Sequence, residues 1–167
     1  DKIKPDTKAL PRWMEKYKGP YVLSCKLDGV SGLYYCKDGE RKLYTRGDGA
    51  IGQDVSHFIP YLNLPSLENA VIRGEFIMKK KTFISKYQDK FANPRNLIAG
   101  TINRLSVNEV VKDIDFICYE VIVPSLKPSM QMDFLKQYSL DCVKYEQRSS
   151  LNNTMLSELL VKWRKEY

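Results

Sequence analysis

The chain has 167 residues, of which 43% are apolar and 28% charged, a composition typical of a globular domain with its own core. It contains no long apolar run and no signal peptide, so we expect a single intracellular, cytoplasmic domain over residues 1–167 with no membrane partner. The net charge of +7 suits a polyanionic partner, although the excess is moderate. The four cysteines lie far apart without a C-x-x-C pair, which favours buried reduced thiols over a metal site.

Helical and strand periodicities alternate along the chain. Thr7 to Lys18 carries apolar side chains on one helical stripe, with Thr7 as its expected cap, and Gly19-Pro20 ends that helix. Asp38-Gly39 between two β-rich runs is typical of a two-residue hairpin turn. The rest of the pattern predicts strands at 21–26, 30–36, 42–46, 71–78, 115–123 and 142–146, and helices at 94–104, 130–138 and 153–166. Hairpins with interspersed helices predict an α+β fold with a largely antiparallel sheet.

One basic run stands out. Lys79-Lys80-Lys81 follows the strand predicted at 71–78. It is explained equally well by a solvated turn and by contact with a phosphate backbone.

Lys26-Leu27-Asp28-Gly29 has the composition of a covalent nucleotide site. Strand alternation would put Lys26 and Asp28 on one side, and Gly29 would allow a tight turn beside a ligand. An ordinary lysine is neutral only about one time in a thousand near pH 7.5, so a lysine nucleophile needs burial or nearby cations to lower its pKa. Alone, however, the four residues also describe an ordinary charged strand end and turn.

Three further segments carry ligand-binding residue types. Thr45-Arg46-Gly47-Asp48-Gly49 runs on to Gly52-Gln53-Asp54-Val55, and glycine turns with one arginine suit phosphate or ribose oxygens, or a flexible hairpin. Arg73-Gly74-Glu75 has a glycine within a strand, which marks a close approach, and Glu75 suits ribose hydroxyls, a metal-bound water or a salt bridge with Arg73. Phe91-Ala92-Asn93-Pro94-Arg95-Asn96 sets Arg95 in the first turn of a helix, where it could meet an anion or remain solvated.

Together, in this order, these motifs resemble the adenylation domain of NAD-dependent DNA ligases. The resemblance covers roughly residues 20 to 120, with a looser match at either end. Phe116-Ile117-Cys118-Tyr119 is also similar to the family strand whose tyrosine stacks on adenine, although a core tyrosine is the alternative. The fold that the resemblance implies is the nucleotidyltransferase (ATP-grasp-like) fold.

The resemblance implies a role for each site residue. Lys26 is the nucleophile that takes AMP from NAD, Asp28 is its catalytic partner, and Asp28 and Glu75 hold Mg²⁺ through water. The nucleotide contacts are Arg46, Glu75 and Tyr119, and Arg95 works at the reactive phosphate or the DNA. AMP then passes to a 5′-phosphate in nicked double-stranded DNA, and the 3′-hydroxyl seals the nick. We expect a monomer.

The chain departs from the family pattern at two positions. Many bacterial members have a glutamate contacting adenine where this chain has Ser24, and a second family arginine is matched by Asn103, with Arg104 one position on. These replacements suggest a divergent, virus-type member in which Arg104 contacts phosphate or DNA. The resemblance also implies an N-terminal nicotinamide-binding domain, a later Asp-Gly-(Val/Ile)-Val-x-Lys strand and C-terminal domains. We therefore expect an adenylation-domain fragment with little nick sealing alone.

Two other interpretations stay open at this point. ATP-dependent polynucleotide ligases and mRNA-capping guanylyltransferases share the Lys-x-Asp-Gly pattern. A non-catalytic DNA-binding module would keep the basic surface, but it would not need Lys26, Asp28 and Glu75 together.

Overall fold

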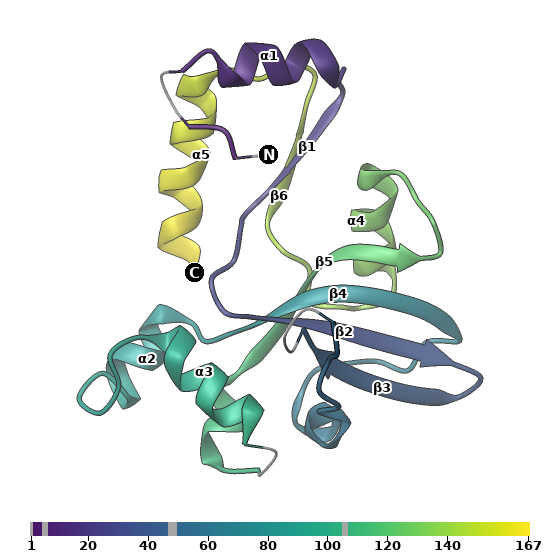
Figure 1. Cartoon of the computed structure of the whole chain (residues 1–167), viewed down its shortest axis with the longest axis vertical. Coiled ribbons are helices and arrows are strands. Elements are labelled where there is room, and N and C mark those ends of the chain that lie inside the picture. The colour runs from purple at the N-terminus through teal and green to yellow at the C-terminus, as the bar shows by residue number, and fades with distance from the viewer. Residues whose placement is uncertain (1, 5–6, 47–49, 105–106) are drawn as a thin grey trace. The chain divides into compact units, whose positions relative to one another are not determined.

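The computed structural model describes residues 2–4, 7–46, 50–104 and 107–167 (Figure 1). Its contacts gather into two compact units, one formed by residues 1–26 and 144–167 and the other by residues 27–143. The single domain expected over residues 1–167 stays a prediction. Along the described residues, no helix has both the length and the apolar character needed to cross a membrane.

The first unit joins the two ends of the chain. Its helix α1 (Ala9–Lys16) leads into β1 (Tyr21–Ser24), which pairs antiparallel with β6 (Tyr145–Arg148), and α5 (Asn153–Glu166) follows β6. The largely buried side chains of this unit are Leu10, Tyr21, Leu159 and Trp163.

The second unit is built on a four-stranded antiparallel sheet in the order β3-β2-β4-β5. Its strands are β2 (Val30–Lys37), β3 (Glu40–Thr45), β4 (Asn69–Ile77) and β5 (Asp115–Val123). Asp38 and Gly39 both have positive φ, which is the backbone of the expected hairpin turn between β2 and β3. Antiparallel sheets with packed helices are therefore confirmed.

Short helices and 3-10 turns complete the second unit. They are η1 (Ser56–Tyr61), α2 (Lys80–Lys86), α3 (Pro94–Asn103), η2 (Glu109–Asp113) and α4 (Pro128–Gln137). Helix α3 contacts β2 and β4, η1 contacts β3, and α4 contacts β5. The buried core includes Tyr34, Leu43, Phe58, Ile72, Phe76, Ile98, Ile102 and Val111.

The sequence predicted most elements to within a few residues. The exceptions are η1, α2 and η2, which were not predicted, and the strands expected at 21–26 and 142–146. In the structure these strands are the shorter β1 and the later β6, which pair from Tyr21 opposite Arg148 to Ser24 opposite Tyr145. One further hydrogen bond, from the Cys25 amide to the Lys144 carbonyl, extends the pairing. Lys26 therefore follows the strand instead of lying on it, and the expected strand alternation does not apply to it.

The expectation of buried thiols is met at two of the four cysteines. All four cysteines are free; Cys36 and Cys118 are buried on β2 and β5, whereas Cys25 and Cys142 are half-buried outside the named strands.

Candidate functional site

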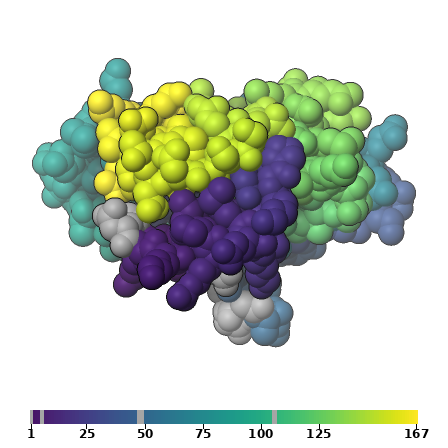
Figure 2. All heavy atoms as spheres, turned by 90° about the horizontal axis from the view of Figure 1, so that it is seen from above, coloured from purple at the N-terminus to yellow at the C-terminus, as the bar shows by residue number. Residues whose placement is uncertain are grey.

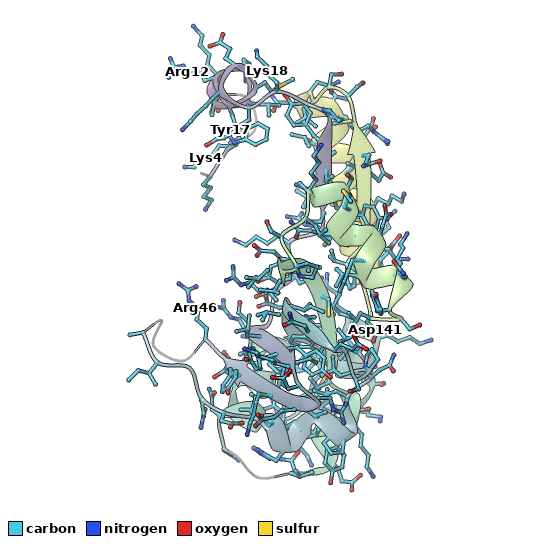
Figure 3. All side chains as sticks on the ribbon, turned by 90° about the vertical axis from the view of Figure 1, so that its right-hand side faces the viewer. Lys4, Arg12, Tyr17, Lys18, Arg46 and Asp141 are labelled. Carbon is cyan, nitrogen blue, oxygen red and sulfur yellow. The ribbon has the colours of Figure 1, made fainter. Side chains whose placement is uncertain are left out.

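One face of the second unit's sheet carries a cavity of about 670 Å³. Because side chains alternate along a strand, Ser31 and Leu33 on β2, Tyr44 on β3 and Arg73 on β4 reach the face opposite the core. Arg46 follows directly after β3 and projects from the end of that strand (Figure 3). The lining residues are Ser31, Gly32, Leu33, Tyr44, Thr45, Arg46, Ala50, Gly52, Arg73 and Tyr119. The cavity thus joins two arginines and two tyrosines from four neighbouring chain segments.

A β-bulge gives Tyr119 its place in this cavity. Arg73 pairs with Glu120 and Gly74 pairs with Cys118, so Tyr119 is the extra residue between two successive pairs. A bulge lets two consecutive side chains share one side of a sheet. Tyr119 therefore lines the cavity, while Glu120 beside it forms an ion pair with Arg73 at 3.1 Å. The alternative predicted from the sequence was a salt bridge between Arg73 and Glu75, whereas the ion-pair partner that the structure gives Arg73 is Glu120.

Ser31 connects the carboxylate and the tyrosine of the site. It lies directly opposite Glu75 on β4, and its hydroxyl donates to the Glu75 carboxylate at 3.3 Å and 3.5 Å. Burial raises the pKa of Tyr119, and a hydrogen bond to Ser31 works against that rise. The sequence reasoning missed Ser31, because its partner could be found only from the register between β2 and β4.

Two glycines of the motifs are required by neighbouring backbone and side chains. A Cβ atom on Gly29 would lie 1.9 Å from the Phe76 carbonyl oxygen. A Cβ atom on Gly74 would lie 2.6 Å from the Phe116 ring and 2.8 Å from the Ile117 carbonyl oxygen. The close approach predicted at Gly74 is therefore an approach by neighbouring residues of the same chain, Phe116 and Ile117, and not by a ligand.

The glycine-rich loop is described only in part. Gly47, Asp48 and Gly49 lie outside the described residues. Beyond them, the Thr45 amide donates to the Gln53 carbonyl at 2.9 Å, which pairs this segment with the end of β3. The Asp54 carboxylate accepts from the Ser56 amide, and hydrogen bonds from Ser56 lower its pKa. Asp54 thus organises the entry to η1.

Arg95 and Asp28 come together at the start of α3. The Asn93 side chain accepts from the Asn96 amide at 2.9 Å, which is the expected N-cap, and Pro94 begins the helix. Arg95 lies in the first turn, with its guanidinium 3.8 Å from the Asp28 carboxylate, and both side chains are largely exposed. An exposed pair of this kind contributes little to stability and leaves both groups open to a ligand.

Arg104 lies at the other end of α3. It is the exposed C-cap residue and keeps helical backbone angles, and the helix is regular through Asn103. At about 100° per residue, nine positions turn Arg104 about 180° away from Arg95 around the helix axis. The family arginine corresponds to Asn103, one position before Arg104. Because α3 stays regular, it does not turn Arg104 into the direction that a side chain at position 103 would take.

Ser24 and Lys26 belong to the first unit. Ser24 ends β1, Lys26 follows in an irregular segment, and both are exposed. The second unit groups Arg46, Arg73, Glu75 and Tyr119 around or beside one cavity, and it holds Asp28 and Arg95 at the start of α3.

Within the described ranges, no three His, Cys, Asp or Glu side chains gather closely enough to hold a metal ion. Any ion at Asp28 or Glu75 would need ligands from elsewhere, such as water and substrate phosphate.

The protein-family model for the NAD-dependent DNA ligase adenylation domain matches residues 6–166 of this chain. This chain belongs to that family.

Similar proteins come from viruses and bacteria. A DNA ligase of Acanthamoeba polyphaga mimivirus is 42% identical over 99% of this chain and 27% of its own length. The putative DNA ligase 205R of Invertebrate iridescent virus 6 is 42% identical over 73% of this chain and 21% of its own length. A DNA ligase of Borrelia hermsii is 31% identical over 80% of this chain and 23% of its own length. The chain spans about a quarter of the length of these relatives, and the resemblance inferred from its motifs is confirmed.

Proposed function

We propose that this ligase-family chain is the core that transfers AMP from NAD to nicked DNA, with Lys26 as the residue that carries the nucleotide. The observation that supports this best is the cavity on the sheet, which joins Arg46, Arg73 and Tyr119. Its volume of about 670 Å³ falls in the range of small-molecule sites.

The cavity, together with Glu75 next to its Ser31, offers a partner for each part of AMP. The Tyr119 ring supplies a face on which adenine can stack. The guanidinium groups of Arg46 and Arg73 suit phosphate oxygens, because each presents several donors in a planar fork. Glu75, whose carboxylate accepts from Ser31, suits the ribose hydroxyls. The Ser24 side chain stands where many relatives use glutamate, and we propose it as a nucleotide contact.

The first chemical step joins Lys26 to AMP. The neutral Lys26 Nζ attacks the α-phosphorus of NAD, forms a P–N bond and breaks the P–O bond to the second phosphate. Nicotinamide mononucleotide leaves with that oxygen, and the amine loses a proton. The AMP then passes to a 5′-phosphate at a nick, and attack by the 3′-hydroxyl releases AMP and seals the strand.

Asp28 and Glu75 fit a magnesium ion that is held mainly through substrate. Magnesium is often bound by one or two carboxylates together with water and substrate phosphates, which needs no larger acidic cluster. When bound, the ion would offset the negative charge that develops on the phosphate. The two carboxylates would hold that ion's water ligands, and the Asp28 carboxylate also lies 3.8 Å from the Arg95 guanidinium.

Arg95 is our candidate for the reactive phosphate or the DNA, because it is exposed at a helix start where free amides also favour anions. Arg104 points about 180° away. We propose that it contacts DNA from another side of α3. We further propose that the working molecule is a monomer in the cell interior, where both NAD and DNA are present.

Intact mass measurement tests the proposal directly. The full-length protein is incubated with Mg²⁺ and NAD, ATP or GTP in turn, and its Lys26→Ala variant is treated in parallel. We expect an AMP adduct with NAD alone, and we expect Lys26→Ala to lose it. Lys144→Ala, in the same unit, is the matched control and should keep the adduct.

Each other outcome identifies a different function. An adduct with ATP or GTP would identify an ATP-dependent ligase or a capping-type enzyme. Absence of an adduct with every nucleotide would favour a DNA-binding module without catalysis.

A further inference from the structure

The excess positive charge of the chain is concentrated in the first unit. Residues 1–26 and 144–167 hold 12 of the 27 Lys and Arg residues but only 6 of the 20 Asp and Glu residues, so they carry +6 of the net +7. The second unit, with more than twice the residues, is close to neutral. A charge excess so unevenly distributed is typical of a surface that meets a polyanion.

Helix α1 presents part of this charge as a stripe. Lys8, Arg12 and Lys16 are spaced four residues apart, so they follow one side of the helix, and all three are exposed. We call these three residues the α1 cationic stripe. The apolar side of the helix carries buried Leu10 and the Trp13 ring, which lies 5.2 Å from the Tyr17 ring and 5.6 Å from the Tyr21 ring.

The stripe is open to a partner. Figure 3 shows Arg12 projecting from α1, and Figure 2, which looks onto this helix, shows the N-terminal residues (purple) uncovered beside the residues of β6 and α5 (yellow-green). Among the described residues, none of the three cations forms a salt bridge. The Lys16 ammonium lies only over the Tyr17 ring, 5.1 Å from its centroid.

Two features of the stripe are unfavourable for the helix itself, although Lys16 in the last turn suits the helix dipole. Like charges four residues apart destabilise a helix, and a cation at the N-cap opposes the helix dipole. Lys8 occupies that N-cap position and makes no side-chain capping bond. These costs would be offset by an anionic ligand that lies along the stripe.

The lysine run of the second unit is a weaker candidate for such a ligand. Burial raises the pKa of Asp115, and the positive charge of nearby Lys79 acts in the opposite direction. In the same region, the Lys86 ammonium forms an ion pair with the Asp113 carboxylate at 2.9 Å. Part of that charge is therefore already matched by acids of the chain.

We infer that the α1 cationic stripe binds the phosphate backbone of duplex DNA. The inference rests on the proposed function for its partner, because that function supplies DNA as the polyanion. The three cations span about 12 Å along the helix axis, and a duplex presents one charge per about 1.7 Å of its own axis. A contact of this kind carries no sequence preference and adds affinity that depends on salt.

The test compares two variants with the same change in net charge. Lys8→Gln/Arg12→Gln/Lys16→Gln removes the stripe, and Lys37→Gln/Lys112→Gln/Lys127→Gln removes three exposed, dispersed cations of the second unit. Binding of a fluorescent nicked duplex is measured by anisotropy at several salt concentrations. Adduct formation with NAD in the absence of DNA is measured by intact mass.

Loss of three phosphate contacts should reduce the slope of log K against log salt by about 2.7 in the stripe variant, and the dispersed variant should lose less than about one unit. Both variants should form the NAD adduct as the parent does. Equal slopes in the two variants, or a parent chain that does not bind duplex DNA, would overturn the inference. Failure of the parent to form an adduct would instead count against the proposed function, so the two failures are distinguishable.

Discussion

The two units of this chain divide between them the residues that we propose for nucleotide transfer. The second unit carries the cavity, with Arg46, Arg73 and Tyr119 at its wall. The first unit carries Lys26 as its last residue before the chain enters the second, and it carries nearly all the excess charge. The proposed nucleophile and the residues lining the cavity therefore fall in different units, so variants can be chosen within one unit at a time.

Among the variants that distinguish the two units, Gly29→Ala is expected to have the largest effect, a loss of stability in the second unit. The added Cβ atom would lie 1.9 Å from the Phe76 carbonyl oxygen, and backbone cannot move aside as a flexible side chain can. We expect the second unit to lose about 3 kcal/mol of unfolding free energy or more. Denaturant titration followed by circular dichroism should show the lower midpoint.

Tryptophan fluorescence makes the same experiment specific to one unit. Both tryptophans of the chain, Trp13 and Trp163, belong to the first unit. If the units unfold separately, Gly29→Ala should leave the fluorescence transition nearly unchanged. Coincident shifts of both signals would mean that the units unfold together. Gly100→Ala is the control, because nothing lies within 4 Å of its new Cβ atom and alanine should stabilise α3 by about 1 kcal/mol.

Tyr119→Ala should weaken nucleotide binding in the second unit without unfolding it. Stacking of a base on an aromatic ring contributes about 1–3 kcal/mol, so NAD-dependent adduct formation at low NAD should slow by about fivefold to 150-fold. Tyr119→Phe keeps the ring and should stay within a few-fold of the parent. Tyr138→Ala, an exposed tyrosine at the end of α4, is the matched control. An unchanged rate for Tyr119→Ala would remove this residue from the proposed site.

The sequence predicted the second unit's strands well because their signals are local. Asp38-Gly39 gave the hairpin, Asn93-Pro94 gave the start of α3, and the apolar run at 115–123 has the bounds of β5. Short elements such as α2, with seven residues, and η1, with six, were missed, since so few residues carry too little periodicity to distinguish a helix from a turn.

The arrangement of the candidate site depended on non-local pairing. Ser31 meets Glu75 only because β2 and β4 pair in that register, and Tyr119 is turned toward the cavity by a bulge that no alternation pattern contains. Identification of the family came from spaced motifs, which require no register. Motif residues are thus readable from the sequence, whereas their hydrogen-bond partners need the sheet.

The smallest effect concerns a part of the second unit remote from the proposed chemistry. Asp113 accepts hydrogen bonds from the Tyr87 hydroxyl and from Lys86, and the Tyr87 bond is the main reason that the pKa of Asp113 is lowered. Burial and the Asp113 carboxylate raise the pKa of Tyr87 to about 12. The cluster ties α2 to η2, so Asp113→Asn should cost about 1–2 kcal/mol of unfolding free energy at neutral pH.

The pH dependence of that cost follows from the two shifts. Because the folded-state pKa of Asp113 lies below the unfolded one, its contribution is present above about pH 4 and is lost as pH falls through the folded pKa. For Tyr87 the folded pKa is raised, so its contribution is present below about pH 10 and is lost as pH rises toward 12. Urea titrations from pH 3 to pH 7 should show the stabilities of parent and Asp113→Asn converging on the acid side. The exposed Asp89→Asn should follow the parent throughout, and a gap for Asp113→Asn that stays constant down to pH 3 would contradict the role of its charge.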